Sequence, residues 1–518
     1  MEKKFINNLT LFLFVIIFGI ITYQNSLVLE YSLLQIRMLD DLALLNSFVR
    51  FKNFVYERNL QYTFGFIDYS YGNLFWILNT IVLTPLTLFN NDAIVIFTSR
   101  QITAFFAFGC LYLVIKISQF FGACKTTSNI IGLFFILTPN FFLWSMKFHV
   151  NYYSVFFGLL SLLILLKSKQ NLLKNIIYSS IFFGVSVGFK LTGILLYPII
   201  IFTLIYKICF FKTKDKLYLL FIFNITFLFS FIISFCPALF LSLFYLEESK
   251  KVLNTIILFK NMGNSTGYLD RALLFKESIK FYYDIIIYVI LVLFGAWWSI
   301  KEYSKFKNPI PLFLLINILV GFFLVTLYFN KSPVYIAAYA MCISSLLPIF
   351  LCGSKFFNKE TVKFFVLFLL LILHVFLNFD FLKIESLRHY KLAKSEEYIN
   401  SKKILKDMEL IIDQNLLKKN NRILIDFNAF FPNGLASQRY VTINYFNETS
   451  NLEAIKKHNI EYAYIVFNKN LKDLKFQGYE IEKKNRELLA TTGFFTENQK
   501  YTLVYSNYNI EMYERNKF

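Results

Sequence analysis

Residues 8–29 read NLTLFLFVIIFGIITYQNSLVL and contain no charged side chain. About 20 consecutive apolar residues are needed for a helix to cross the hydrocarbon core of a bilayer, and this stretch has that length. The charged residues Glu2, Lys3 and Lys4 precede it, and no small-residue cleavage site follows it. We therefore expect an uncleaved first membrane span and not a signal peptide.

The composition of the whole chain extends this interpretation. Of its 518 residues 57% are hydrophobic, 20% are aromatic and only 17% are charged, and the mean hydropathy is +0.53. Soluble domains are typically about 45–50% apolar and about 25% charged. A single soluble core rarely grows beyond roughly 250–300 residues. The apolar excess therefore requires lipid as its solvent, and it excludes a soluble enzyme, a disordered protein and a collagen-like fibre.

The distribution of lysine decides how many further apolar stretches cross the membrane. If 74–89 crosses, the lysines within 167–174, 212–216 and 301–307 fall outside, against the preference of Lys and Arg for the cytoplasmic side. If 74–89 lies along the surface, these lysines fall inside. We therefore expect eleven spans with a cytoplasmic amino terminus, and we interpret the net charge of +20 mainly as an orientation signal. The other candidate spans are 95–117, 129–145, 152–166, 175–190, 191–211, 217–246, 285–300, 310–329, 335–353 and 364–380.

The fold class that follows is a polytopic α-helical membrane protein with a carboxyl-terminal extracytoplasmic α/β domain. Residues 1–380 form the membrane domain, with outer loops at 30–94 and 247–284. Residues 381–518 form the soluble domain. In this part we expect a helix over 404–419 and short strands in the β-rich runs 422–427, 439–444, 461–467, 501–505 and 510–513.

An acidic pair stands in the first outer loop, in the stretch RMLDDLALLN at 37–46. Asp40 and Asp41 are costly at a membrane surface unless they are solvated, paired or used. Such a pair can take a proton from an acceptor hydroxyl or help to hold a divalent cation. An ordinary solvated loop is the alternative interpretation.

Two further groups of polar and aromatic residues follow at the expected outer surface. Tyr71, Asn73 and Trp76 in YGNLFW could offer hydrogen bonds and a stacking face to a sugar, or they form an aromatic belt at the headgroups. His149 and Asn151 in KFHVNY could orient a substrate or a water, or the histidine is merely interfacial. Both groups are candidate substrate-binding residues.

Cations on the outer side are candidates for binding a lipid phosphate. Lys190, in GFKLTG, and Lys331, in NKSP, are both exceptions to the cytoplasmic preference, and Arg271 is a weaker candidate of the same kind. Snorkelling of long side chains is the competing explanation. The sequence has no GxxxxGK[ST], no GxGxxG after a soluble strand, no HExxH and no CxxC box. A sugar transferase working outside the membrane would therefore use a lipid-linked donor, and no metal ligands are defined.

The order of these features resembles the GT-C glycosyltransferases, and most closely family 39, which includes the protein O-mannosyltransferases and the bacterial lipid A aminoarabinose transferases. The resemblance in layout covers essentially the whole chain. It implies a hexosyl or pentosyl transferase in the bacterial inner membrane that uses a polyprenyl-phosphate-linked sugar. The acceptor would be lipid A or another glycolipid, a glycan or a protein on the outer face.

The resemblance also implies roles for residues. The family's acidic pair, usually Asp-Glu, corresponds to Asp40 and Asp41, with Asp40 in the first place, and its basic residues near the lipid phosphate map to Lys190 and Lys331. The His-Pro-Asp of related mannosyltransferases corresponds to His149-Val-Asn, so a carboxylate is lost and metal dependence stays open. The usual Pro-Pro of the surface helix is absent.

We therefore expect an inverting transfer in which Asp40 or Asp41 activates an acceptor hydroxyl and Lys190 and Lys331 hold the leaving phosphate. A transporter or lipid flippase is one alternative, although we find no internal repeat and the charges cluster at segment ends. A non-catalytic assembly protein for surface polysaccharide is another.

Overall fold

The computed structural model describes most of the membrane-embedded part and selected segments of the carboxyl-terminal part. The described residues are 2–34, 38–67, 71–167, 171–210, 215–239, 284–323, 345–357, 359–413, 415–416, 422–425, 430–432, 434, 441–442, 463–468, 501–507 and 510–516. The chain divides into two compact units: the first is Met1–Ser26, Arg50–Thr84 and Phe97–Arg388, and the second is Leu27–Val49, Pro85–Ile96 and His389–Phe518. The boundary expected at residue 380 stays a prediction.

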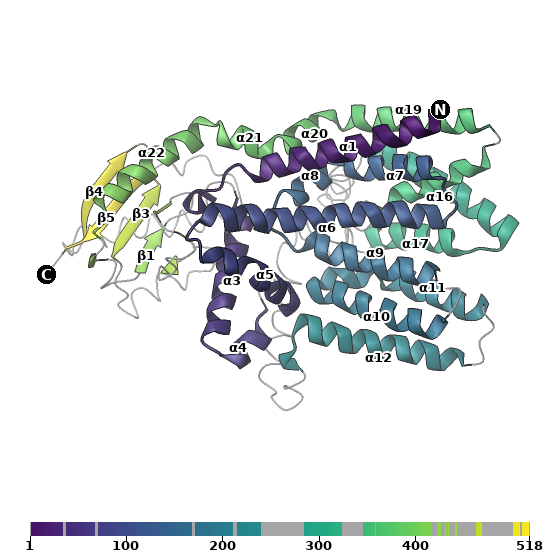
Figure 1. The fold of residues 1–518 in the computed structure, drawn as a ribbon, viewed down its shortest axis with the longest axis horizontal. Coiled ribbons are helices and arrows are strands. Elements are labelled where there is room, and N and C mark those ends of the chain that lie inside the picture. The colour runs from purple at the N-terminus through teal and green to yellow at the C-terminus, as the bar shows by residue number, and fades with distance from the viewer. Residues whose placement is uncertain are drawn as a thin grey trace. The chain divides into compact units, whose positions relative to one another are not determined.

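The first unit consists of helices (Figure 1). Six helical segments are long and apolar enough to cross a membrane, or eight if each of two bent pairs is one span, among the residues that the structure describes. The expected count of eleven stays a prediction, because the candidate spans 217–246, 310–329 and 335–353 lie partly outside the described residues. The helices are α1 (Glu2–Asn25), α4 (Leu60–Gly65), α5 (Asn73–Thr87), α6 (Asp92–Phe120), α7 (Lys125–Ile136), α8 (Pro139–Ser145), α9 (Asn151–Lys167), α10 (Leu172–Phe189), η2 (Leu191–Leu196), α11 (Tyr197–Phe210), α12 (Lys216–Phe235), α16 (Ile285–Phe306), α17 (Ile310–Phe323), η4 (Leu347–Phe356), α19 (Glu360–Leu377) and α20 (Phe379–Ser386).

The segment expected as one span at 129–145 is a broken helix. Helices α7 and α8 meet at an angle of 70°. Thr138 begins α8, because its hydroxyl accepts a hydrogen bond from the backbone N–H of Phe141 over 3.3 Å. Pro139 follows at the first helical position, where its missing N–H costs nothing. His374 on α19 stacks on Phe134 beside this break, at 5.2 Å between ring centroids.

Hydroxyl groups join α9 to α10. Ser154 donates to the carbonyl of Ser186 over 2.9 Å, and Ser186 donates back to the carbonyl of Ser154 over 2.7 Å. These two hydrogen bonds connect α9 and α10 at one end of the helix pair. Ser161 and Ser179 form a similar contact further along, with their hydroxyl oxygens 2.8 Å apart. Such hydrogen bonds between helices are favourable in lipid because no water competes for the donors.

Glycines bring α10 close to α12. A Cβ at Gly184 would lie 2.6 Å from Cβ of Ser230 and 2.7 Å from the carbonyl oxygen of Phe227. A Cβ at Gly188 would lie 2.4 Å from Cβ of Ser234. Small residues spaced four apart on both helices let the two backbones approach closely. Inside a bilayer, where the hydrophobic effect does not drive helices together, such close van der Waals packing stabilises their association. Helices α9, α10, α11 and α12 consequently run side by side (Figure 1).

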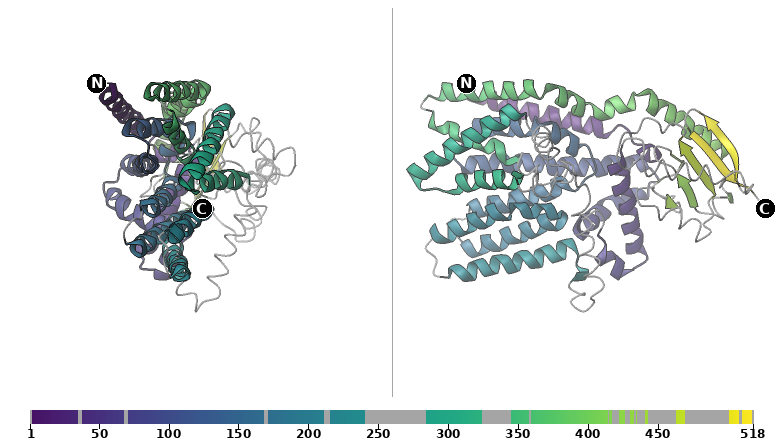
Figure 2. Two further views of the ribbon diagram at one scale, coloured as in Figure 1. Left: turned by 90° about the vertical axis from the view of Figure 1, so that its right-hand side faces the viewer. Right: turned by 180° about the vertical axis from the view of Figure 1, so that it is seen from behind.

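The second unit contains a five-stranded sheet of order β2-β1-β3-β5-β4 (Figure 2). Strands β2, β1 and β3 are parallel, and β5 and β4 complete the sheet as an antiparallel pair. Each of the five β-rich runs expected from the sequence overlaps one strand, and β3, β4 and β5 extend beyond the ends of their runs. The strands are β1 (Arg422–Ile425), β2 (Val441–Thr442), β3 (Tyr464–Asn468), β4 (Tyr501–Asn507) and β5 (Ile510–Arg515).

The helix expected over 404–419 begins and ends earlier than the apolar periodicity suggests. Helix α22 (Glu396–Ile411) starts after Ser395, whose hydroxyl accepts a hydrogen bond from the backbone N–H of Tyr398 over 3.2 Å. This cap adds two polar turns that hydrophobic periodicity alone does not reveal. The short helix α21 (Arg388–Ala393) precedes it.

Residues that follow α1 belong to the same unit as the carboxyl-terminal helices. Tyr398 donates a hydrogen bond to Glu30 over 2.5 Å, and the ammonium of Lys402 lies 2.6 Å from the other carboxylate oxygen. Burial raises the pKa of Glu30, but the hydrogen bonds from Lys402 and Tyr398 and the charge of Lys402 outweigh burial and hold this pKa below its usual value. The unit also contains η1 (Tyr31–Leu33) and the first part of α3 (Leu39–Tyr56).

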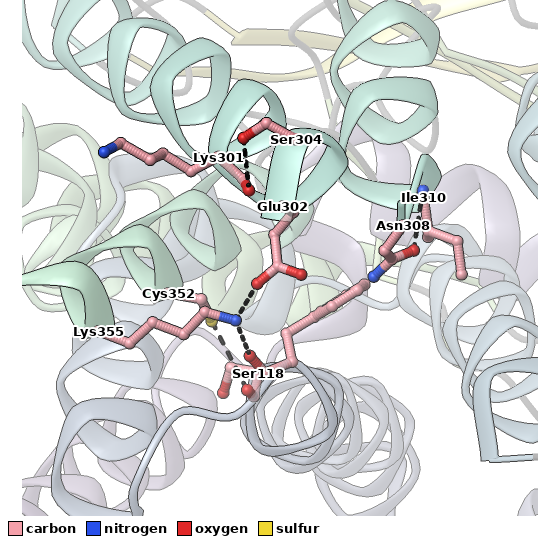
Figure 3. A network of polar contacts seen from close by, with 9 residues as sticks. Ser118, Lys301, Glu302, Ser304, Asn308, Ile310, Cys352 and Lys355 are labelled. Carbon is pink, nitrogen blue, oxygen red and sulfur yellow. Dashed lines mark hydrogen bonds and ion pairs between the residues drawn. The ribbon is translucent and has the colours of Figure 1, made fainter. Parts of the chain in front are cut away.

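A buried carboxylate joins α16, η4 and the end of α6 in the first unit (Figure 3). Glu302 is 5% exposed and pairs with the ammonium of Lys355. Lys355 also donates to the carbonyl of Phe121 over 3.3 Å. The thiol of Cys352 donates to the carbonyl of Ser118 over 3.6 Å. These contacts gather segments that the lysine distribution assigns to the cytoplasmic side.

Candidate functional site

A backbone bridge joins the segment before α5 to the end of α10. Tyr71 and Lys190 form an isolated antiparallel bridge, and the N–H of Gly72 donates to the carbonyl of Phe189 over 3.3 Å. A Cβ at Gly72 would lie 1.9 Å from the carbonyl oxygen of Gly188. Only glycine permits this approach, and the bridge places the side chains of Tyr71 and Lys190 next to each other.

Four predicted site residues meet at this bridge. The hydroxyl of Tyr71 lies 2.9 Å from Nε2 of His149, and Nδ1 of His149 accepts a hydrogen bond from the backbone N–H of Asn151 over 3.3 Å. The ammonium of Lys190 donates to Oδ1 of Asn151 over 2.8 Å and lies 5.5 Å from the centroid of the Tyr71 ring. We call Tyr71, His149, Asn151 and Lys190 the outer cluster.

Residues of the outer cluster and its neighbours are buried, and some of their polar atoms have no hydrogen-bond partner among the described residues. Lys190 is 3% exposed and Asn151 is fully buried. Within the described part of the chain, Nδ2 of Asn151, Nε1 of Trp144 and Oγ1 of Thr192 have no hydrogen-bond partner. The Trp144 ring lies 4.6 Å from the His149 ring, and Thr192 follows Lys190 by two residues. Buried polar atoms without partners are rare in proteins, and a ligand that accepts hydrogen bonds would satisfy them.

Asn73 and Trp76 support the outer cluster from within the core. The carboxamide of Asn73 donates to the carbonyl of Thr63. Trp76 is fully buried, and its ring packs edge to face against Phe66 and Phe75 at 5.5 and 4.9 Å between centroids. Both residues therefore position the start of α5.

The structure adds two residues that were not among the predicted site residues. Thr103 on α6 accepts a hydrogen bond from the backbone N–H of His149 over 3.3 Å. Arg100, one helical turn earlier, is fully buried. A charged residue inside an apolar helix is expensive and usually functional, so the pair Ser99-Arg100 within an expected span is the signal that could have identified this face of α6.

Asp40 and Asp41 lie in the first turn of α3, where carboxylates stabilise a helix through its dipole. Asp41 is 1% exposed, whereas Asp40 is exposed. Consecutive helical residues point about 100° apart, so the two carboxylates leave α3 in different directions and we assign no shared cation to them. Both belong to the second unit, and the outer cluster belongs to the first.

Two predicted phosphate-binding residues, Lys331 and Arg271, lie outside the described residues, as does most of the loop 247–284. Among the described residues, no three His, Cys, Asp or Glu side chains are grouped so that they could hold a metal ion. Metal ligands therefore stay undefined.

Comparisons with known proteins bear on the fold. No family model matches the chain, and no curated protein matches it. Among solved structures, ArnT from Cupriavidus metallidurans, bound to undecaprenyl phosphate, is 11% identical with a TM-score of 0.50, over 96% of this chain and 97% of that one. The oligosaccharyltransferase from Archaeoglobus fulgidus, in complex with zinc and sulfate, is 12% identical with a TM-score of 0.44, over 88% of this chain and 66% of that one. The expected fold is confirmed: the chain has the GT-C architecture, a helical membrane domain followed by a carboxyl-terminal domain.

Proposed function

We propose that this protein is a glycosyltransferase that moves a sugar from a polyprenyl-phosphate-linked donor to an acceptor on the outer face of the membrane. The observation that carries the proposal is the outer cluster in a chain of GT-C fold: the buried ammonium of Lys190 lies beside Nδ2 of Asn151, which has no hydrogen-bond partner among the residues that the structure describes. A phosphate oxygen accepts hydrogen bonds from both kinds of donor, and a charge-assisted bond to a buried ammonium is among the strongest available.

In the proposed reaction, Lys190 stabilises the leaving group. The acceptor oxygen forms a bond to the anomeric carbon while the bond from that carbon to the phosphate oxygen breaks, and its electron pair stays on the polyprenyl phosphate. Negative charge therefore develops on the phosphate in the transition state. A preorganised ammonium near that charge lowers the barrier, because it costs no reorganisation at the moment of reaction.

The acceptor proton goes to a carboxylate in this scheme. Asp40 or Asp41 receives it, with Asp40 as the first candidate because it is the exposed member of the pair. One displacement at the anomeric carbon inverts its configuration. The roles of Asp40, Asp41, Lys331 and Arg271 are predictions from the sequence that mutation must test.

The identity of the lipid is supported by the solved structure with the same fold, since that ArnT is bound to undecaprenyl phosphate. The acceptor is lipid A or another glycolipid, a glycan or a protein. The sugar is a hexose or a pentose, and a bacterial inner membrane is the proposed location.

The second unit supports the proposed orientation. Glu30, five residues after the end of α1, contacts Tyr398 and Lys402 of α22 within the second unit, and this contact supports the proposal that residues 27–49 and the carboxyl-terminal helices share one side of the membrane. In the proposed orientation the two termini lie on opposite sides of the membrane, which agrees with the odd number of spans, eleven, expected from the sequence. A periplasmic reporter such as alkaline phosphatase at the carboxyl terminus should be active, and a silent periplasmic reporter with an active cytoplasmic one would overturn this orientation.

The decisive test uses the full-length protein in lipid nanodiscs with radiolabelled undecaprenyl-phosphate sugars and a panel of glycolipid, glycan and peptide acceptors. We expect release of undecaprenyl phosphate together with a labelled product of inverted anomeric configuration. A flippase would move the lipid without breaking the sugar–phosphate bond, and an assembly protein would do neither. Intact donor throughout the panel would overturn the proposal.

A further inference from the structure

Cys124 lies at the start of α7, where the surroundings of its thiol stabilise a negative charge. It is the N-cap residue of this helix, and it is exposed. Its Sγ lies 3.2 Å from the hydroxyl oxygen of Thr127. The first N–H groups of a helix carry partial positive charge. Cysteines at such positions ionise more readily, and the thiolate is the nucleophilic form of cysteine.

A lysine on α19 provides a second positive charge, and this lysine is more than nine-tenths buried. Lys363 is 7% exposed and is the fourth residue of α19. Among the residues that the structure describes, its ammonium has no hydrogen-bond or ion-pair partner. The ammonium of Lys355 differs, because it pairs with Glu302 (Figure 3). A buried cation without an anion is costly, so the position of Lys363 requires a negative charge nearby.

The packing of α7 against α19 places Cys124 and Lys363 at the same end of the helix pair. The rings of Phe134 and His374 stack at 5.2 Å between centroids. Phe134 follows Cys124 by ten residues, and His374 follows Lys363 by eleven. At a rise of 1.5 Å per residue both intervals span about 15–17 Å, and the two helices run in the same direction (Figure 1). Lys363 therefore lies beside the start of α7.

The ionisation of Cys124 agrees with this placement. Burial raises the pKa of its thiol, but the hydroxyl and N–H of Thr127, the charge of Lys363 and the N–H of Thr126 outweigh burial and hold this pKa below its usual value. Cys352 is the contrasting thiol, since it is 1% exposed and donates a hydrogen bond to a backbone carbonyl over 3.6 Å. A buried thiol that keeps its proton is inert.

We propose that Cys124 is a reversible modification site: its thiolate compensates the charge of Lys363 and forms mixed disulfides with low-molecular-weight disulfides. In this reaction Sγ of Cys124 attacks one sulfur of the small disulfide, and a new S–S bond forms. The original S–S bond breaks, and its electron pair leaves on the second sulfur as a thiolate. One disulfide replaces another, so the exchange requires no further oxidant.

The test measures mixed-disulfide formation in the full-length protein in nanodiscs at pH 7 with dithiodipyridine, a small disulfide. Peptide mass spectrometry quantifies the product at each cysteine. We expect Cys124 to react at least about threefold faster than Cys209, because a larger thiolate fraction outweighs the lower nucleophilicity of a less basic thiolate. Cys209 is the internal control, since it is also exposed but lies in the last turn of α11. Cys352 should stay unmodified. Equal rates at Cys124 and Cys209 would overturn the proposal.

Variants of Lys363 separate its electrostatic effect from simple exposure of the thiol. Lys363→Gln should slow the reaction of Cys124 about threefold, whereas Lys363→Arg keeps the charge and should restore the wild-type rate. Lys359→Gln is the matched control, because this exposed lysine lies one helical turn earlier. Thermal unfolding shows which variants fold, and the comparison with Cys209 in the wild-type chain decides the case if Lys363→Gln does not. A wild-type rate in folded Lys363→Gln, or equal slowing in Lys359→Gln, would overturn the proposal.

Discussion

The ammonium of Lys190 donates a hydrogen bond to the carboxamide oxygen of Asn151 over 2.8 Å, and this contact joins the residue directly after α10 to the first residue of α9. Asn151 positions the ammonium without adding a negative charge. Its own Nδ2 has no partner among the described residues and is a second donor beside the first. The contact brings two hydrogen-bond donors together at the ends of two helices, and in the proposed function this corner holds the lipid phosphate.

Replacing Lys190 tests this corner directly. Lys190→Gln should raise the KM for the lipid-linked donor by about 10–100-fold, because it removes a charge-assisted hydrogen bond worth about 1.5–3 kcal/mol. Lys207→Gln is the matched control: this lysine is also buried, and it donates to the carbonyl of Leu166 over 2.8 Å. The control should lower stability without changing that KM. Equal KM values for the two variants would remove Lys190 from the site.

Replacing Asp40 and Asp41 with asparagine tests the acidic pair, because asparagine removes the negative charge and keeps nearly the same shape. Asp40→Asn should lower kcat by at least about 100-fold, as expected for loss of a general base, while Asp41→Asn should mainly lower stability because its side chain is buried. The double variant should insert into the membrane and be inactive. Turnover by the double variant at the wild-type rate would exclude both carboxylates from the chemistry.

The close packing of α10 on α12 predicts a strong effect of a single methyl-bearing side chain. Gly184→Val should lower the unfolding temperature markedly, since its Cβ would overlap Ser230 and the carbonyl of Phe227, and overpacking costs about 1–3 kcal/mol. Gly19→Ala in α1 is the control, because nothing lies within 4 Å of its added Cβ. Thermal unfolding in detergent measures both, and Gly19→Ala should be neutral or slightly stabilising. A neutral Gly184→Val would argue against this helix contact.

The pair of Glu302 and Lys355 should show the asymmetry of a buried ion pair. Lys355→Met alone leaves the buried Glu302 carboxylate uncompensated and should destabilise the protein by about 3–5 kcal/mol. Adding Glu302→Gln should restore much of that loss, since the double variant buries no charge. The cycle is read from chemical or thermal unfolding in detergent, and additive losses would mean that the two residues do not interact.

The lowered pKa of Glu30 leads us to expect that the second unit loses stability at acidic pH. Its folded pKa lies below the usual value of 4.5, so its contribution is complete above that pH and is lost as the pH falls through the folded pKa. At pH 7 Glu30→Gln should cost about 0.5 kcal/mol, a small amount because the pair is partly exposed. The difference from wild type should vanish below the folded pKa. Glu409→Gln, an exposed position on α22, should show no such pH-dependent difference in thermal unfolding.

Composition and periodicity determined the class of fold, because partitioning into lipid depends on the local count of apolar residues. The spans near α1, α6 and α12 and all five strand positions are recognisable in this way. The break between α7 and α8 was not recognised, since Thr138 and Pro139 are also compatible with a continuous helix. The start of α22 was missed because Ser395 acts through one capping hydrogen bond and not through a hydrophobic pattern.

The sequence by itself also predicted candidate site residues: Tyr71, His149, Asn151 and Lys190 were all candidates before their contacts were known. Only the tertiary structure decided that these four meet, because 119 positions separate the first from the last and no periodicity encodes such a contact. Tertiary structure likewise decided that Trp76 packs in the core. The local pattern of apolar and polar residues reflects the free energy of transferring each segment from water into lipid. A binding site depends instead on the distances between segments, which only the folded chain sets.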